Sequence, residues 1–125
     1  MQNSQIKTVT TYPSIVGGVL AQMRGQQSLH QEDVAKAVGV TQTTWSRIEN
    51  GQSSISVEHL RLAASKLGIQ PNRILQYADQ AATNMEFGGV EVMAARNDTS
   101  LNPAVVLLAG AALGAIIMYA IANSK

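Results

Sequence analysis

Few side chains in this sequence of 125 residues have the chemistry of a catalytic or metal-binding centre. The chain has no cysteine, which excludes disulfides, thiolate metal sites and cysteine nucleophiles. Its two histidines, His30 and His59, are too few for a histidine-built metal site or proton relay. No nucleophile–base set, paired carboxylates or glycine loop for phosphate stands out. We therefore expect a binding protein and not an enzyme, with no metal and no other cofactor.

The charge of the chain is almost balanced. Nine Lys and Arg residues stand against eight Asp and Glu residues, a formal net charge of +1. This excludes a strongly basic protein that coats nucleic acid, and the length excludes a large enzyme of two domains. Hydrophobic residues make up 46% of the chain but aromatic residues only 4%, so the apolar content is mostly Ala, Val, Leu and Ile.

The distribution of apolar residues divides the chain into five segments. Residues 14–78 have helical spacing and most of the charge, whereas residues 104–122 have no charged residue at all. The remaining segments are polar or mixed. We expect a flexible arm (1–13), a helical domain (14–78), a linker (79–103), an apolar helix (104–122) and a short tail (123–125).

The spacing within 14–78 predicts five helices, at about 14–25, 31–38, 42–49, 57–67 and from Pro71 to 78. The second and third of these are short, and three residues join them: Gly39, Val40 and Thr41. Two short helices with a three-residue turn that contains glycine are typical of the helix-turn-helix motif. Ala35 is small where the two helices cross, and Ile48 anchors the second of them to the core.

The stretch LHQEDVAKAVGVTQTTWSRIENG (29–51) resembles the Cro/C1-type repressors, also called the XRE-like helix-turn-helix family. The resemblance extends over about 14–78, and the Leu-Gly-Ile that follows the fourth helix stands in register as well. It implies a compact bundle of five helices that binds double-stranded operator DNA, usually as a homodimer.

The resemblance also implies roles for individual residues. Arg24 and Glu49 match a pair that ties the first helix to the third. Gln31 matches a glutamine that meets a DNA phosphate, and Asn50 a residue near the phosphate backbone. The residues at recognition-helix positions, which we expect to contact DNA as well, are Thr41, Gln42, Thr43, Ser46 and Arg47. Glutamine can form two hydrogen bonds with adenine, and arginine can do so with guanine.

Three features depart from the family pattern. Trp45 occupies an inward position of the third helix that is usually smaller and aliphatic, and we interpret it as a core residue. The loop at 52–57 has no Lys or Arg. Within 14–78 the basic residues exceed the acidic ones by only two: Arg24, Lys36, Arg47, Arg61, Lys66 and Arg73 against Glu32, Asp33, Glu49 and Glu58. Few phosphate contacts predict modest affinity and a requirement for a dimer.

The apolar segment 104–122 is long enough to cross a bilayer, since nineteen helical residues extend for nearly 30 Å, a length that follows from a rise of about 1.5 Å per residue. Gly110 and Gly114 are four residues apart, a spacing that permits close pairing of membrane helices. We therefore expect a single-pass protein of the inner membrane, with the lipid bilayer as a partner and the N-terminal domain in the cytoplasm. A helix buried in an oligomer core is the alternative.

Together these patterns predict an all-α protein: a five-helix Cro/C1-type bundle, a linker and one C-terminal transmembrane helix. The function that they favour is a membrane-anchored, sequence-specific DNA-binding regulator of transcription. One alternative is a membrane scaffold or assembly factor whose helix-turn-helix domain binds a protein partner at the membrane. The other is an antitoxin-like repressor whose apolar tail is buried in a partner protein.

Overall fold

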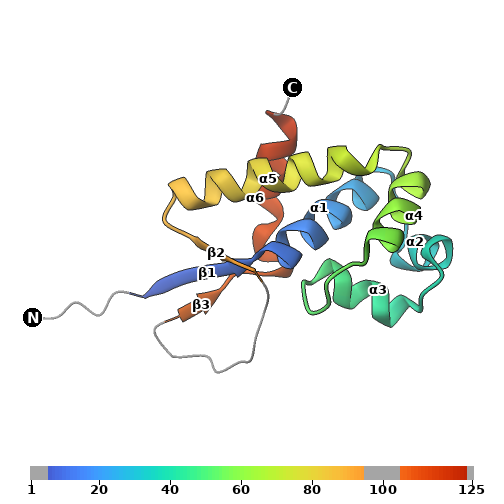
Figure 1. The fold of residues 1–125 in the computed structure, drawn as a ribbon, viewed down its shortest axis with the longest axis horizontal. Coiled ribbons are helices and arrows are strands. Elements are labelled where there is room, and N and C mark those ends of the chain that lie inside the picture. Colours follow the sequence, from blue (N-terminus) through green and yellow to red (C-terminus); the bar gives the residue numbers. More distant parts are fainter. Residues whose placement is uncertain (1–5, 95–104, 124–125) are drawn as a thin grey trace, which may run out of the picture.

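The computed structural model describes residues 6–94 and 105–123, and in them the chain forms a helical bundle with a small sheet at one end (Figure 1). The α-helices of this part are α1 (Tyr12–Gln26), α2 (Gln31–Val38), α3 (Gln42–Glu49), α4 (Val57–Leu67), α5 (Pro71–Phe87) and α6 (Gly114–Ala122). The other elements are strands β1 (Lys7–Thr11), β2 (Glu91–Met93) and β3 (Val105–Leu107) and the short 3₁₀ helix η1 (Gly110–Leu113). Figure 1 shows α2, α3 and α4 at one end and the sheet at the other, with α1 and α5 running between them.

Local capping residues set the limits of α1 to α4. Thr11, Thr41 and Ser56 each accept a hydrogen bond from a backbone N–H three residues later, which satisfies a donor that the first turn of a helix leaves free. At the other ends, Gly39 and Gly68 adopt left-handed conformations with φ of +88° and +71°. The limits of these helices therefore follow from short-range signals, and they agree closely with those expected from the sequence.

The sheet is the part of the fold that the sequence did not predict, so the all-α class is wrong in this respect. Its strand order is β2-β1-β3, and β1 pairs in parallel with both neighbours. Val9 lies opposite Glu91 on one side and opposite Leu107 on the other. The predicted flexible arm 1–13 thus contains a strand and the first residues of α1, while its residues 1–5 lie outside the described part.

Helix α5 is longer than expected and continues to Phe87, well into the predicted linker 79–103. Its buried positions continue with it, since Ala78, Ala81 and Met85 all join the core. Strand β2 also lies within the predicted linker. Residues 95–103 of the predicted linker lie outside the described part.

The predicted transmembrane helix 104–122 does not form. Residues 105–107 are a strand, residues 110–113 a 3₁₀ helix, and only the nine residues of α6 are α-helical. Throughout residues 6–94 and 105–123, no helix combines the length and apolar character needed to cross a bilayer. Three predictions depended on a membrane helix in this segment: the single-pass inner-membrane location, the bilayer as a partner and the scaffold held at the membrane. The predicted location is therefore wrong.

Three apolar residues of η1 and α6 pack on the protein itself. Leu113, Ile117 and Ala120 are fully buried and belong to the same core as α1 to α5. Helix α6 lies against α1 and α5, and it crosses α5 in Figure 1. Gly110 and Gly114, predicted to pair membrane helices, lie beside Asn50 and Gln22 of the same chain. The strongest apolar run of the sequence thus completes the bundle.

Candidate nucleic-acid interface

Helices α2 and α3 are joined by the turn that the sequence predicted. Gly39 supplies the left-handed residue, and Thr41 begins α3 by accepting a hydrogen bond from the N–H of Thr44 at 3.1 Å. The side chains of Trp45 and Ile48 extend from α3 into the core, and their exposed fractions are 0% and 3%. Because one face of α3 is buried in this way, its opposite face is left to the solvent.

The DNA-contacting residues expected from the sequence gather on or near that outer face. Ser46 and Gln31 are half-buried, and the rest are exposed: Thr41, Gln42, Thr43, Arg47 and Asn50. Arg47 forms no salt bridge with any residue that the structure describes. The outer face of α3 thus combines an amide, a hydroxyl and a guanidinium group, which together can donate to and accept from polar groups of a ligand.

A buried carboxylate, that of Glu49, holds α3 to its neighbours. Glu49 is 4% exposed and accepts two hydrogen bonds from Arg24 of α1, at 2.7 Å to Oε2 and 3.0 Å to Oε1. The same hydrogen bonds raise the pKa of Arg24 above its ordinary value, although partial burial opposes them. The structure therefore brings Arg24 and Glu49 together as a bidentate ion pair, a geometry that fixes direction as well as distance.

Two further donors reach Glu49, and the sequence analysis identified neither of them. The indole Nε1 of Trp45 donates to Oε2 at 2.6 Å, and the side-chain amide of Gln31 donates to Oε1 at 2.9 Å. Trp45 is a core residue, as predicted, but it is also a hydrogen-bond donor. Its spacing of four residues from Glu49 on one helix was a signal for this contact.

Gln31 connects this buried group to the outer face of α3. Its carbonyl Oε1 accepts a hydrogen bond from Nε2 of Gln42 at 3.1 Å. Gln42 is the first residue of α3 and is exposed. A continuous series of hydrogen bonds therefore runs from the core, through Glu49 and Gln31, to a side chain on the candidate interface.

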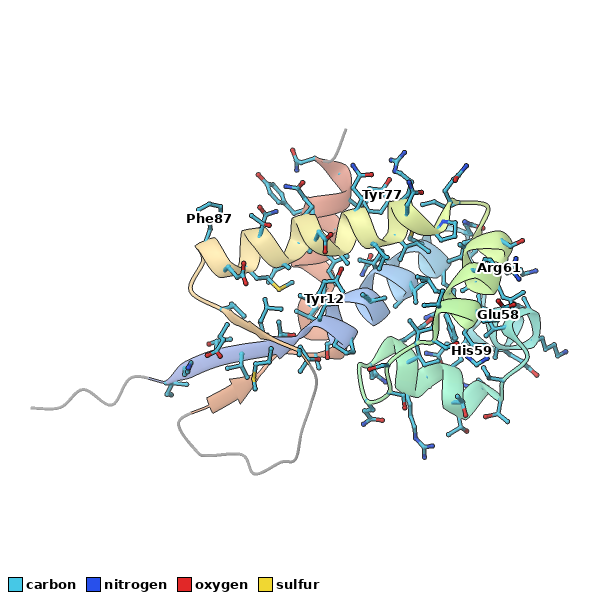
Figure 2. All side chains as sticks on the ribbon, viewed as in Figure 1. Tyr12, Glu58, His59, Arg61, Tyr77 and Phe87 are labelled. Carbon is cyan, nitrogen blue, oxygen red and sulfur yellow. The ribbon has the colours of Figure 1, made fainter. Side chains whose placement is uncertain are left out.

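The surroundings of α3 carry little positive charge. Arg61 of α4 is paired with Glu58 at 2.8 Å, and both side chains are exposed (Figure 2). The loop between α3 and α4 contributes serine and glutamine and no basic side chain. Within residues 6–94 and 105–123, no three His, Asp or Glu side chains come together as a metal site would require. The chemistry of the candidate interface is thus that of hydrogen bonding, with Arg47 as its charged member.

Comparison with known families and structures agrees with this geometry. A helix-turn-helix family model matches residues 20–74, which include α2, α3 and α4 entirely. The chain therefore contains a helix-turn-helix domain of the Cro/C1 type. No curated protein matches the chain in sequence.

Solved structures show the same fold. A crystal structure of the clp gene regulator ClgR from Corynebacterium glutamicum has a TM-score of 0.60 and 21% identity, covering 62% of this chain and 82% of that one. A second ClgR structure has a TM-score of 0.52 and 24% identity, covering 54% and 88%. A variant of the restriction-modification controller protein C.Esp1396I has a TM-score of 0.54 and 20% identity, covering 58% and 95%. These likenesses concern the fold.

Proposed function

We propose that this protein is a sequence-specific DNA-binding regulator of transcription, with α3 as its recognition helix. The observation that carries the proposal is the division of α3 into two faces. Trp45, Ile48 and Glu49 are buried on one face, whereas Gln42, Thr43 and Arg47 are exposed on the other. An α-helix presented in this way fits the major groove of B-form DNA.

Each exposed side chain then has a role that its chemistry allows. Arg47 donates two hydrogen bonds to guanine, Gln42 pairs with adenine, and Thr43 and Ser46 contact neighbouring base edges. Thr41, Gln31 and Asn50 lie at the ends of α2 and α3, where contacts go to phosphates that fix the position of the helix. The named solved structures of similar fold are a gene regulator and a restriction-modification controller, which agrees with this assignment.

We further propose that the protein binds a palindromic site as a homodimer. The basic residues of the helix-turn-helix region exceed its acidic residues only slightly, and Arg61 is already paired with Glu58. One copy therefore makes few phosphate contacts and binds weakly. Two copies on two half-sites combine their contacts, so a two-fold symmetric operator gives the affinity that one copy lacks. The alternatives, a protein-binding scaffold or an antitoxin-like repressor, find no comparable support.

Selection of DNA from a randomised duplex library tests the proposal. The full chain should enrich a discrete palindromic sequence, and a variant with both Gln42→Ala and Arg47→Ala should enrich none. Each lost bidentate contact corresponds to about 1–3 kcal/mol of discrimination between bases. Binding to the selected site should also weaken steeply with salt.

Lys66→Ala is the matched control, since it removes one positive charge, as Arg47→Ala does. Lys66 is exposed in the last turn of α4, at the far end of that helix from the loop that follows α3. The control should still select the wild-type sequence. Equal enrichment by the wild type and the double variant would refute the proposed function.

A further inference from the structure

Helix α6 is apolar around its whole circumference, although one side of it is exposed. Its sequence, GAIIMYAIA, contains no charged residue, and neither does the rest of the segment 104–122. Ile117 and Ala120 are fully buried against the bundle. A helix that is hydrophobic all round is typically buried all round, whereas a surface helix carries polar residues on its outer face. The outer side of α6 therefore lacks the residues of a permanently solvated helix.

The exposed residues of α6 form one continuous stripe on the side away from the core. They lie at positions i, i+3, i+4 and i+7, and we call them the α6 stripe: Ala115, Met118, Tyr119 and Ala122. The side chain of Met118 is 46% exposed and that of Tyr119 is 64% exposed. This spacing is that of a helix which packs against another helix along one seam. The stripe therefore suits a second apolar helix.

A lipid surface fits the stripe poorly. Helices that lie in a membrane interface carry lysine and arginine on their polar face, and α6 has neither. Helix α6 is also short, since nine residues extend for only about 13 Å. A protein surface that is itself apolar is the better occupant, and the same stripe on a second copy of the chain is such a surface.

The place of α6 in the fold favours a second copy. Figure 1 shows α3 at one edge of the bundle and the C-terminal end of α6 at the opposite edge. Contact through the α6 stripe therefore leaves α3 free. A two-fold axis parallel to α6 keeps both copies of α3 on the same side of a dimer. This is the arrangement that a two-fold symmetric DNA site requires.

The size of the stripe predicts a weak dimer. A stable dimer buries about 800 Å² per partner, with about 20–30 residues on each side. Four side chains of one short helix bury much less than this. We therefore expect a dissociation constant of about 10–100 µM without DNA. Two half-sites on one DNA molecule hold two copies close together, and the higher effective concentration makes a weak contact sufficient.

We propose that the α6 stripe is the surface through which two copies of this chain pair, in parallel, on a palindromic DNA site. Around the two-fold axis each residue of the stripe meets its own counterpart, so Met118 of one copy faces Met118 of the other. The inference rests on the proposed function, because it names the dimer contact of that regulator, but the contact itself is measurable without DNA. Helix α6 lies outside the matched residues 20–74, so the surface belongs to the C-terminal segment of this chain.

Sedimentation equilibrium of the full chain without DNA tests the inference. The wild type should change from monomer to dimer as its concentration rises through about 10–100 µM. Met118→Glu and Met118→Lys each place two like charges opposite one another, so each should raise the dissociation constant at least roughly tenfold. An equimolar mixture of the two variants opposes glutamate and lysine and should restore association. Salt should weaken the mixed dimer more than the wild-type dimer.

Phe87→Glu is the matched control, because it introduces the same charge at an exposed apolar residue outside the stripe. Phe87 is at the end of α5 and is 87% exposed (Figure 2). This variant should associate as the wild type does. Ala122→Lys is a second stripe variant, and lysine is favourable at the C-terminal end of a helix. It should also prevent association, and it decides the matter if circular dichroism shows that the Met118 variants do not fold.

The possible outcomes separate this inference from the proposed function. A wild type that stays monomeric throughout, or a mixture that associates no better than its components, would refute the α6 contact. Binding of the monomer to phosphatidylglycerol vesicles, lost in Met118→Glu, would assign the stripe to lipid instead. If the wild type selects a palindromic site, Met118→Glu should bind it roughly tenfold more weakly and bind a single half-site equally well. If no site is selected, the proposed function fails, and sedimentation alone decides the contact.

Discussion

The two sides of α1 are attached to the rest of the molecule in different ways. On one side, a Cβ atom at Gly17 would lie 2.1 Å from the carbonyl oxygen of Ile48, so the backbones of α1 and α3 are in direct contact. On the other side, a Cβ atom at Gly18 would lie 2.3 Å from Cδ1 of Ile117, the end of a side chain of α6. Adjacent glycines thus serve two different interfaces.

The chemistry of the two interfaces differs as well. The α1–α3 interface adds the two hydrogen bonds of Arg24 to Glu49, which are directional. The α1–α6 interface consists of buried aliphatic side chains, whose packing stabilises without fixing a direction. We infer that the first interface determines how α3 is presented, and that the second mainly supplies buried area. Two predictions test this difference, and a third concerns the contact of α1 with α5 at the start of α1.

The largest effect is expected at the apolar interface. Ile117→Ala should lower the free energy of unfolding by about 2–5 kcal/mol, because the residue is fully buried against α1. Urea unfolding followed by circular dichroism measures this change. Met118→Ala on the same helix is the control: Met118 is 46% exposed, and its truncation should change stability by less than about 0.5 kcal/mol. Equal effects of the two variants would contradict the packing of α6 described above.

Substitution of the two adjacent glycines should have unequal effects. Gly17→Ala should lower the free energy of unfolding by about 1–3 kcal/mol. It should also weaken DNA binding, because the carbonyl oxygens of Ile48 and Glu49 belong to the backbone of α3 and can move away only if the helix shifts. Gly18→Ala should cost less, because the Ile117 side chain can change rotamer and alanine favours a helix by up to about 1 kcal/mol. Chemical denaturation and DNA titration of both variants give the comparison. Similar losses in the two variants would show that the interfaces do not differ as proposed.

The smallest effect concerns the start of α1, outside both interfaces. The Tyr12 hydroxyl donates to Asp79 of α5 at 2.5 Å, and burial, with this hydrogen bond and the charge of Asp79, raises the pKa of Tyr12 to about 12. Since the ordinary pKa is 10.0, the stability that Tyr12 contributes is complete below about pH 10 and is lost as the pH rises through 12. Tyr12→Phe should cost about 0.5–1 kcal/mol at pH 8 and nearly nothing above pH 12.

Absorbance at 295 nm follows the ionisation of Tyr12 directly. The folded wild type should show a step near pH 12 that Tyr12→Phe lacks, whereas Tyr119→Phe should retain it. Tyr119 is a suitable control because its side chain is 64% exposed. If Tyr12→Phe retained the late step, the Tyr12–Asp79 bond would not be the cause.

The parts of the fold that the sequence predicted are those with short-range signals. Helices α2, α3 and α4 begin at a capping residue, and α2 and α4 end at a left-handed glycine, all of which can be identified within a few positions. The sheet depends on partners far apart in the chain, and the polar strand KTVTT gives no sign of where they are. The segment after residue 104 was misinterpreted because an uncharged run of that length suits a bilayer and a protein core equally well. The two possibilities are distinguished only by the helices α1 and α5, against which α6 packs.

The candidate interface also combines features that short-range patterns predict with features that depend on the three-dimensional fold. The positions of Gln42, Thr43 and Arg47 on one face of α3 follow from helical spacing and the inward placement of Trp45 and Ile48. The links from Trp45 and Gln31 to Glu49 depend on side-chain directions in three dimensions. The face of the helix on which each residue lies could therefore be predicted, but the hydrogen-bond partner of its side chain could not.

The position of β1 has a consequence for the order of folding. The hydroxyl of Thr10 bonds to the carbonyl of Leu108, 98 residues further along the chain, whereas the contacts between α2 and α3 join near neighbours. Closing so long a loop costs conformational entropy before any contact repays it. The helix-turn-helix end should therefore form first, and the sheet should join the two ends of the chain last. Amide hydrogens of β1 should accordingly exchange with solvent faster than those in the middle of α1.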